Sequence, residues 1–185
     1  MKHFLSICLL LSSLFTNEIF ASSVEPLSDV PEFEEPYIEI GYKSVVEALK
    51  ECETHNKREL KLPIKLPSIE FTHHLGRCVN DKDNDNDQLQ IEYLHKAKGK
   101  NHYNIDVRPI EQKVDFGKSR VGRGKYKLKD GSDALYFTTK SPKTRGGFNI
   151  LVFEKSGWQY CLSVDSRLGS QLTADLLIEI AESIK

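Results

Sequence analysis

The segment FNILVFEKSGWQYCLSV, residues 148–164, carries the strongest structural signal in the chain. Two apolar and aromatic runs, Phe148–Phe153 and Trp158–Val164, flank the short polar stretch Glu154–Gly157. Aromatic and β-branched residues favour strands, and a glycine in a short connection can supply the positive φ of a tight turn. The segment therefore predicts a β-hairpin. Because Ile150–Phe153 is continuously apolar, we expect the first strand to be central and covered on both faces.

Amphipathic patterns extend outward from this hairpin in both directions. After it, Thr173 can cap a helix whose apolar residues recur at helical spacing as far as Ile184. Towards the N-terminus, apolar residues in Tyr42–Cys52 have the same spacing and predict a second helix. The two prolines of Leu62–Pro67 favour an extended segment there. Five further runs read as strands: Ile69–Val79, Leu89–Leu94, Tyr103–Ile110, Tyr126–Leu128 and Ala134–Thr138.

This order of elements predicts an α+β fold. We expect an antiparallel meander of about six or seven strands, with an N-terminal and a C-terminal amphipathic helix. The chain has 185 residues, 39% of them hydrophobic and 29% charged, and a formal net charge of -1. These values exclude a multipass membrane protein, a collagen-like chain, a fully disordered chain and a cysteine-dense miniprotein. A nearly neutral chain also gives no reason to expect a nucleic-acid partner.

The N-terminus has the three parts of a secretory signal peptide. Lys2 supplies the positive charge, Phe4–Phe15 forms an apolar region, and Ala21 provides a small residue at the expected cleavage site. We therefore predict a signal peptide over residues 1–21 and a secreted, extracellular or cell-envelope-associated protein. No transmembrane span is expected after cleavage, because the apolar region is too short to cross a bilayer.

A composition change divides the remaining chain. Residues 22–40 contain six acidic residues, three prolines and neither lysine nor arginine, which favours an extended, weakly packed segment. Residues 41–185 are expected to form a single α+β domain. Three cysteines remain after the predicted cleavage, Cys52, Cys78 and Cys161. Because secretion permits disulfides, they allow either one bridge with one free thiol or three unpaired thiols.

The hairpin and the last helix together resemble a known family. The segments Phe148–Tyr160 and Leu172–Ile184 are similar to the C-terminal signature of a domain of unknown function in extracytoplasmic proteins of Bacillus-like bacteria, some of them anti-sigma-factor-like. The resemblance implies a curved antiparallel sheet wrapped around helices, as in lipoprotein carriers. It also implies a place in a Gram-positive cell envelope, and it brings no catalytic residues with it.

An acidic stretch, DKDNDNDQLQIE at residues 81–92, is close to the pattern of a calcium-binding loop. Such a loop takes oxygen ligands from alternate positions and a bidentate carboxylate from its twelfth position. The ligands of a Ca²⁺ site would be Asp81, Asp83, Asp85, Asp87 and Glu92. The alternative interpretation is a solvated hairpin loop, because Asp and Asn are common turn residues and the flanking segments read as strands.

Histidines give a weaker metal signal. The five in the predicted mature chain are His55, His73, His74, His95 and His102. His73 and His74 would point to opposite faces of a strand, so the two cannot easily hold one ion together. Their spacing does not have the close pairing typical of zinc sites. We therefore expect them to be surface or half-buried residues, with a metal-dependent hydrolase as the less favoured alternative.

Basic residues outnumber acidic ones between Lys96 and Lys129, and several follow one another in a glycine-containing stretch. In a secreted protein such a patch would attract an anionic envelope polymer, a lipid headgroup or an acidic protein. The alternative is a solvated face, or one paired with the acidic segment. The predicted patch consists of Lys113, Lys118, Arg120, Arg123, Lys125 and Lys127.

These observations favour a secreted, non-enzymatic binding module whose ligand is a lipid, a peptide or an anionic envelope polymer. A calcium-stabilised surface or structural protein is the first alternative, and an enzyme is the second. The sequence contains no nucleophile-elbow or phosphate-loop pattern that would favour catalysis.

Overall fold

The computed structural model describes residues 32–80, 86–116, 121–140, 143, 146–171 and 173–185. Within these limits Glu32–Lys185 forms one compact unit. The predicted signal peptide and residues 22–31 of the predicted acidic segment lie outside the described residues.

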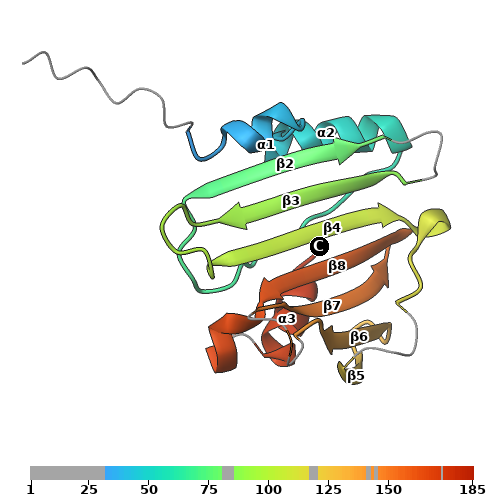
Figure 1. The fold of residues 1–185 in the computed structure, drawn as a ribbon. Helices are drawn as coiled ribbons and strands as arrows, with labels where there is room; N and C mark the ends of the chain where they lie inside the picture. The colour runs from blue at the N-terminus through green and yellow to red at the C-terminus, as the bar shows by residue number, and fades with distance from the viewer. Residues whose placement is uncertain (1–31, 81–85, 117–120, 141–142, 144–145, 172) are drawn as a thin grey trace, which may run out of the picture. The chain divides into compact units, whose positions relative to one another are not determined.

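One open antiparallel sheet of eight strands dominates the unit, in the spatial order β1-β2-β3-β4-β8-β7-β6-β5 (Figure 1). Each neighbouring pair is antiparallel, and β4 and β8 join two meanders in the middle of the sheet. The strands are β1 (Lys43–Ser44), β2 (His73–Val79), β3 (Gln88–Leu94), β4 (His102–Pro109), β5 (Val121–Lys127), β6 (Asp133–Thr138), β7 (Phe148–Lys155) and β8 (Trp158–Asp165).

The sheet has eight strands, more than the six or seven expected, and the strand that the sequence did not indicate is the short edge strand β1. Two residues are too few to show the alternation of apolar and polar side chains by which a strand is recognised in a sequence. The predicted antiparallel sheet with helices towards both ends is confirmed in its broad outline. The predicted hairpin is present, and Ser156 and Gly157 connect its strands with φ values of 50° and 79°. Two successive positive φ values are typical of a type I′ turn, which suits the twist of a hairpin.

Three α-helices accompany the sheet: α1 (Glu35–Glu39), α2 (Val45–Asn56) and α3 (Ala174–Ala181). Two short 3₁₀ segments, Ile110–Gln112 and Ser166–Gln171, follow β4 and β8. The extended conformation expected for residues 22–40 does not hold for α1, where Pro36 occupies a position in the first turn that proline tolerates well. No described helix is both long and apolar enough to cross a membrane.

Local capping explains where α2 and α3 begin. The Ser44 hydroxyl accepts a hydrogen bond from the Glu47 amide, and the Glu47 side chain accepts one from the Ser44 amide, which completes a capping box. At α3, the Thr173 hydroxyl accepts from the amide of Leu176, as the sequence predicted.

A single hydrophobic core fills one face of the sheet. Residues of β3, β4, β7 and β8 alternate in direction, so every second side chain points into this core. Helix α2 packs against β2 and β3, and α3 packs against β7. The extended segment between α2 and β2 crosses the same face, where the Glu59 carbonyl accepts a hydrogen bond from the Trp158 indole and the Lys61 carbonyl accepts one from the Tyr160 hydroxyl.

The contact between α2 and β2 requires a glycine and is locked by a disulfide. A Cβ atom at Gly76 would lie 2.9 Å from both the Ala48 Cβ and the Val45 Cα, so any larger residue would push the helix away. Cys52 of α2 is bonded to Cys78 of β2, and Cys161 is a free thiol. Of the two cysteine arrangements left open by the sequence, the structure has the one with a single bridge.

Removal of the Cys52–Cys78 bridge should destabilise the fold. The bridge closes a loop with a sequence separation of 26 residues, which corresponds to about 3.5 kcal/mol in the chain-entropy description of disulfide stabilisation. We expect the double variant Cys52→Ala/Cys78→Ala to lose roughly this amount of unfolding free energy in urea titrations at pH 7. The matched control Cys161→Ala keeps the bridge and should lose no more than about 1 kcal/mol. A double variant as stable as the parent would contradict this account.

Candidate functional site

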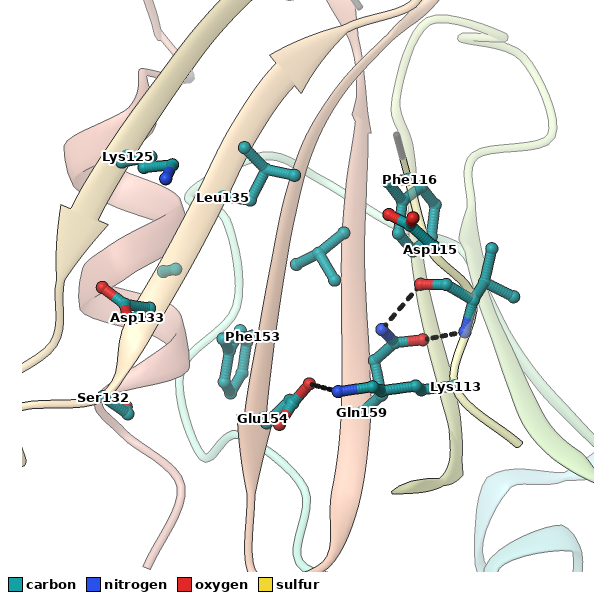
Figure 2. A pocket seen from close by; sticks show the side chains of 13 residues that line it. Lys113, Asp115, Phe116, Lys125, Ser132, Asp133, Leu135, Phe153, Glu154 and Gln159 are labelled. Atoms are coloured by element: carbon teal, nitrogen blue, oxygen red, sulfur yellow. Dashed lines mark hydrogen bonds and ion pairs between the residues drawn. The ribbon is translucent and has the colours of Figure 1, made fainter. Parts of the chain in front are cut away.

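A pocket of about 650 Å³ lies on the second face of the sheet, opposite the core. Lys125, Leu135 and Val152 form one cross-strand row that contributes side chains to it, and the cross-strand pair Glu154 and Gln159 contributes further side chains together with Asp133 of β6. Residues 113–116, which follow β4, form the opposite wall (Figure 2). The lining residues are Lys113, Val114, Asp115, Phe116, Lys125, Ser132, Asp133, Ala134, Leu135, Val152, Phe153, Glu154 and Gln159.

The wall formed by residues 113–116 is held in place by the Gln159 side chain. The Gln159 amide group donates to the Val114 carbonyl at 3.0 Å, and its oxygen accepts from the Val114 amide at 2.9 Å (Figure 2). Gln159 therefore pairs with Val114 as a neighbouring strand would. A ring contact between Phe116 and Phe137, with centroids 5.5 Å apart, holds the end of the segment. Because Gln159 is only 5% exposed, these hydrogen bonds are protected from water.

Two cations of the predicted basic patch are paired with acids of neighbouring strands. Lys113 lies 3.0 Å from Glu154, and Lys127 lies 2.9 Å from Asp133. Lys125 also lines the pocket, and among the described residues it has no ion-pair or hydrogen-bond partner. Lys118 and Arg120 lie outside the described residues, as does the side chain of Arg123, whose backbone belongs to β5. The structure thus brings Lys113 and Lys125 to one pocket and pairs two of the three patch cations whose side chains are described with acids.

The predicted calcium ligands are only partly described. Asp81, Asp83 and Asp85 lie outside the described residues. Asp87 contacts His55 at 3.0 Å. Glu92 lies four residues beyond Gln88, the first residue of β3. This corresponds to about 13 Å along an extended strand, so the Glu92 side chain does not reach back to the start of the strand, where the predicted loop ends.

The Glu92 carboxylate instead takes part in a network with β4. It contacts His102 Nε2 at 2.6 Å and accepts a hydrogen bond from the Asn104 side chain at 3.1 Å. Its side chain is 17% exposed. Asp87 therefore contacts His55 of α2 whereas Glu92 contacts residues of β4, and the structure does not bring these two acids to a common point.

The other histidines have structural contacts. His73 and His74 are successive residues of β2 and make separate contacts, His73 with Phe33 and Glu34 and His74 with Phe71 and Tyr93. Among the described residues there is no group of three or more His, Cys, Asp or Glu side chains that could hold a metal ion.

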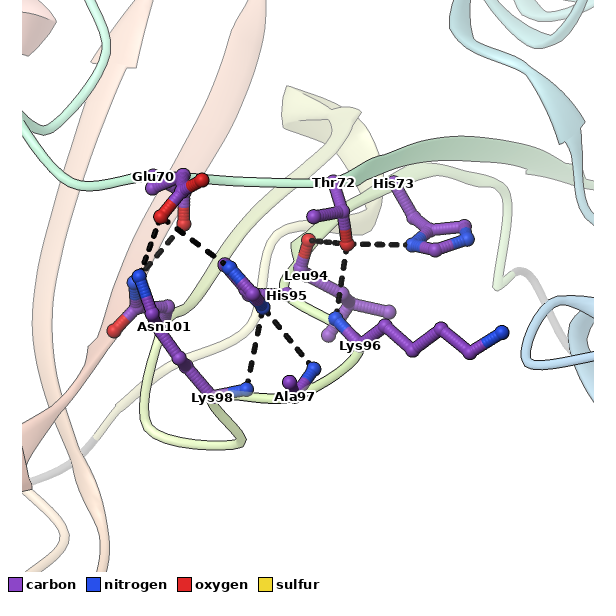
Figure 3. Close-up of polar contacts among 9 residues, drawn as sticks. All are labelled: Glu70, Thr72, His73, Leu94, His95, Lys96, Ala97, Lys98 and Asn101. Atoms are coloured by element: carbon purple, nitrogen blue, oxygen red, sulfur yellow. Dashed lines mark hydrogen bonds and ion pairs between the residues drawn. The ribbon is translucent and has the colours of Figure 1, made fainter.

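His95 holds the turn between β3 and β4. Its Nδ1 atom accepts hydrogen bonds from the backbone amides of Ala97 and Lys98, at 3.1 and 3.2 Å, and its Nε2 atom lies 3.4 Å from Glu70 (Figure 3). Since Nδ1 accepts twice, the proton of the neutral ring is on Nε2, facing the carboxylate. This position fits a structural role in the turn.

Sequence reasoning missed the polar character of the central second face. His102, Asn104, Asp106 and Arg108 alternate along β4 with buried apolar residues, and this alternation was the available signal. Burial, with a smaller contribution from the Glu92 charge, raises the pKa of Asp106 to about 6. Burial and the nearby Asp106 charge likewise raise the pKa of the Cys161 thiol to about 12, so this thiol is protonated at neutral pH.

The raised pKa of Asp106 should make stability depend on pH. The folded protein holds the Asp106 proton more tightly than the unfolded chain, whose ordinary value is 3.8. The free energy of unfolding therefore falls as the pH rises from about 4 to about 6, by roughly 2–3 kcal/mol from this group. We expect the stability advantage of Asp106→Asn over the parent to grow by this amount in urea titrations between pH 4 and pH 7.

The control for this prediction is Asp133→Asn, which changes an exposed carboxylate of the same sheet. Its stability difference from the parent should stay nearly constant between pH 4 and pH 7, because exposed ion pairs contribute little. An Asp106→Asn protein that is no more stable than the parent at pH 7 would show that burial does not oppose ionisation at this position.

Comparisons with known proteins found no matching family model, no matching curated protein and no matching solved structure.

Proposed function

We propose that the protein is a secreted, non-enzymatic binding module. Its ligand carries an apolar group and an anionic group, and both are held in the pocket between residues 113–116 and strands β5–β7. Secretion is supported by the signal-peptide pattern at the N-terminus and by the Cys52–Cys78 bridge, because disulfides persist mainly in oxidising compartments. We also propose that the protein resembles extracytoplasmic domains with a curved sheet like that of lipoprotein carriers.

The observation that carries the binding proposal is a cation that has no acidic partner within the described part of the chain and lies above an apolar floor. Leu135 and Val152 are cross-strand neighbours, and Phe116 faces them from the opposite wall. Lys125 adjoins Leu135 on β5 and has no acidic partner among the described residues. An anionic group of the ligand gains a charge-assisted contact with Lys125. The apolar part of the ligand covers Leu135 and Val152 and so removes their apolar surface from water. The size also suits this role, since small-molecule sites are commonly about 300–1,000 Å³.

The remaining charges support binding over catalysis. Lys113 and Glu154 are engaged with each other at the pocket wall, and the Gln159 amide is occupied by the Val114 backbone. Each of these groups therefore shapes the pocket. Lys125 lines the pocket and has no acidic partner among the described residues, so its ammonium group is available to an anionic ligand.

The proposal can be tested with two related dyes and the predicted mature chain, Ser22–Lys185, which contains the whole compact unit. Anilinonaphthalene sulfonate combines an aromatic body with one anionic group, and N-phenylnaphthylamine has the same body without the charge. We expect Lys125→Ala to weaken sulfonate binding by about tenfold, corresponding to about 1.4 kcal/mol, in fluorescence titrations. Binding of the neutral dye should be unchanged.

Lys127→Ala is the matched control, because Lys127 is on the same strand and the same face but is paired with Asp133 and does not line the pocket. It should leave the neutral dye bound as in the parent and weaken sulfonate binding less than Lys125→Ala does, because its loss only leaves Asp133 of the pocket lining unpaired. If the two lysine variants lose sulfonate affinity equally, the loss reflects the general surface charge and not a contact with Lys125. Sulfonate binding that is insensitive to Lys125→Ala would place the dye elsewhere and remove the basis of the proposal.

A further inference from the structure

Strand β5 is the long free edge of the sheet. Within the described residues it pairs only with β6, and no strand lies beyond it. A register shift separates Val121 from Gly124, and pairing with β6 is regular from Gly124 to Lys127. The outward amide and carbonyl groups of this four-residue stretch are available to another extended chain. At the opposite edge, β1 has only two residues and offers no comparable length.

The side chains of this edge differ on its two faces. Lys125 and Lys127 pair with Leu135 and Asp133 of β6 and share the pocket face. Tyr126 points to the other face, where its ring meets that of Tyr136 at a centroid distance of 6.3 Å. A chain added beside β5 would lie about 4.8 Å from it, which is nearer to these lysines than to the acids of β6 and β7. One face of the edge therefore carries two lysines, of which Lys127 is paired with Asp133 and Lys125 has no acidic partner among the described residues, and the other face carries the aromatic ring of Tyr126.

We propose that an extended acidic polypeptide segment adds to β5 as a ninth strand. This inference rests on the proposed function and names its ligand class: the anionic group at Lys125 is a carboxylate side chain of the added segment. The segment has the alternation acid–apolar–acid. Its two acids face Lys125 and Lys127, and its apolar residue covers Tyr126 on the opposite face. Opposite charges directly across a strand pair are stabilising, as are apolar residues placed against aromatic rings.

Charge argues against a second copy of the protein as the occupant. Antiparallel pairing of two β5 strands would place cationic side chains of one copy opposite those of the other, and the sequence of Val121–Lys127 contains no acid to relieve this. Like charges directly opposite each other destabilise a strand pair. Lysines and bulges are devices that protect free edges from pairing with identical edges. The same lysines favour an acidic strand.

The test uses an eight-residue peptide of alternating valine and glutamate with the predicted mature chain. In an extended strand the amides of alternate residues point to opposite edges, so N-methylation of all valines removes the donors of one edge and N-methylation of all glutamates removes those of the other. We expect the parent peptide and one methylated version to bind in calorimetric titrations. The other methylated version should lose at least tenfold in affinity. A valine–lysine peptide should also lose at least tenfold.

Hydrogen exchange provides a second measurement. Peptide binding should slow exchange of outward amides within Gly124–Lys127, whereas the sulfonate dye should not, because it has no backbone to pair with the edge. Lys125→Ala should weaken the valine–glutamate peptide, and Glu51→Ala, which removes an exposed charge on α2 far from β5 in the sequence, should not.

The outcomes separate this inference from the proposed function. If the sulfonate dye binds in a Lys125-dependent way and the peptide does not bind, the pocket stands and strand addition is overturned. Equal binding by both N-methylated peptides would also overturn it, since the contact would not involve the backbone. If neither dye nor peptide depends on Lys125, both proposals fail. A concentration-dependent dimer that protects the same β5 amides would make a second copy the occupant and overturn the acidic segment.

Discussion

The pairing of β4 with β8 is the constraint on which the rest of the structure depends. It joins the two meanders into one sheet, with seven residue pairs from Tyr103↔Val164 to Pro109↔Trp158. This register places Ile105 beside Leu162 in the core and leaves Asp106 beside Cys161 on the other face. A slip of one residue would exchange the two faces, exposing the apolar set and burying the polar one. The cost of burying those polar side chains makes the observed register the stable one.

The same register builds the pocket. It sets Gln159 of β8 beside Arg108 of β4, close to the point where the chain leaves β4, and Gln159 then binds the backbone of Val114. The segment that forms one wall of the pocket is thus fixed by a side chain from a strand about 45 residues later in the chain. Strands β7, β6 and β5 follow β8 outward in the sheet; β7 and β6 provide the floor of the pocket, and β5 provides the free edge. The positions of the core, the pocket and the free edge therefore all depend on the pairing of β4 with β8.

The two faces of the sheet carry different physical roles. The core face is closed by α2, α3 and the extended segment between α2 and β2, and its aromatic polar atoms at Trp158 and Tyr160 are satisfied by backbone carbonyls. The second face holds Asp106 with a raised pKa, together with the network of Glu92, His102 and Asn104. Polar groups held in this way reduce stability relative to an apolar surface of the same shape. They leave the second face as the side on which a polar or charged ligand can be recognised.

The sequence by itself determined the local structure. The Phe148–Val164 hairpin, the cap at Thr173 and the alternation along β3 and β4 depend on residues close together in the chain, so their patterns are readable without a fold. The tertiary structure decided which distant residues meet. Counting charges near Lys113 and Lys127 suggested an open basic patch, yet their partners Glu154 and Asp133 come from later strands. The bridge between Cys52 and Cys78, the burial of Asp106 and the free edge at β5 have the same origin, because strand order and register are properties of the assembled sheet.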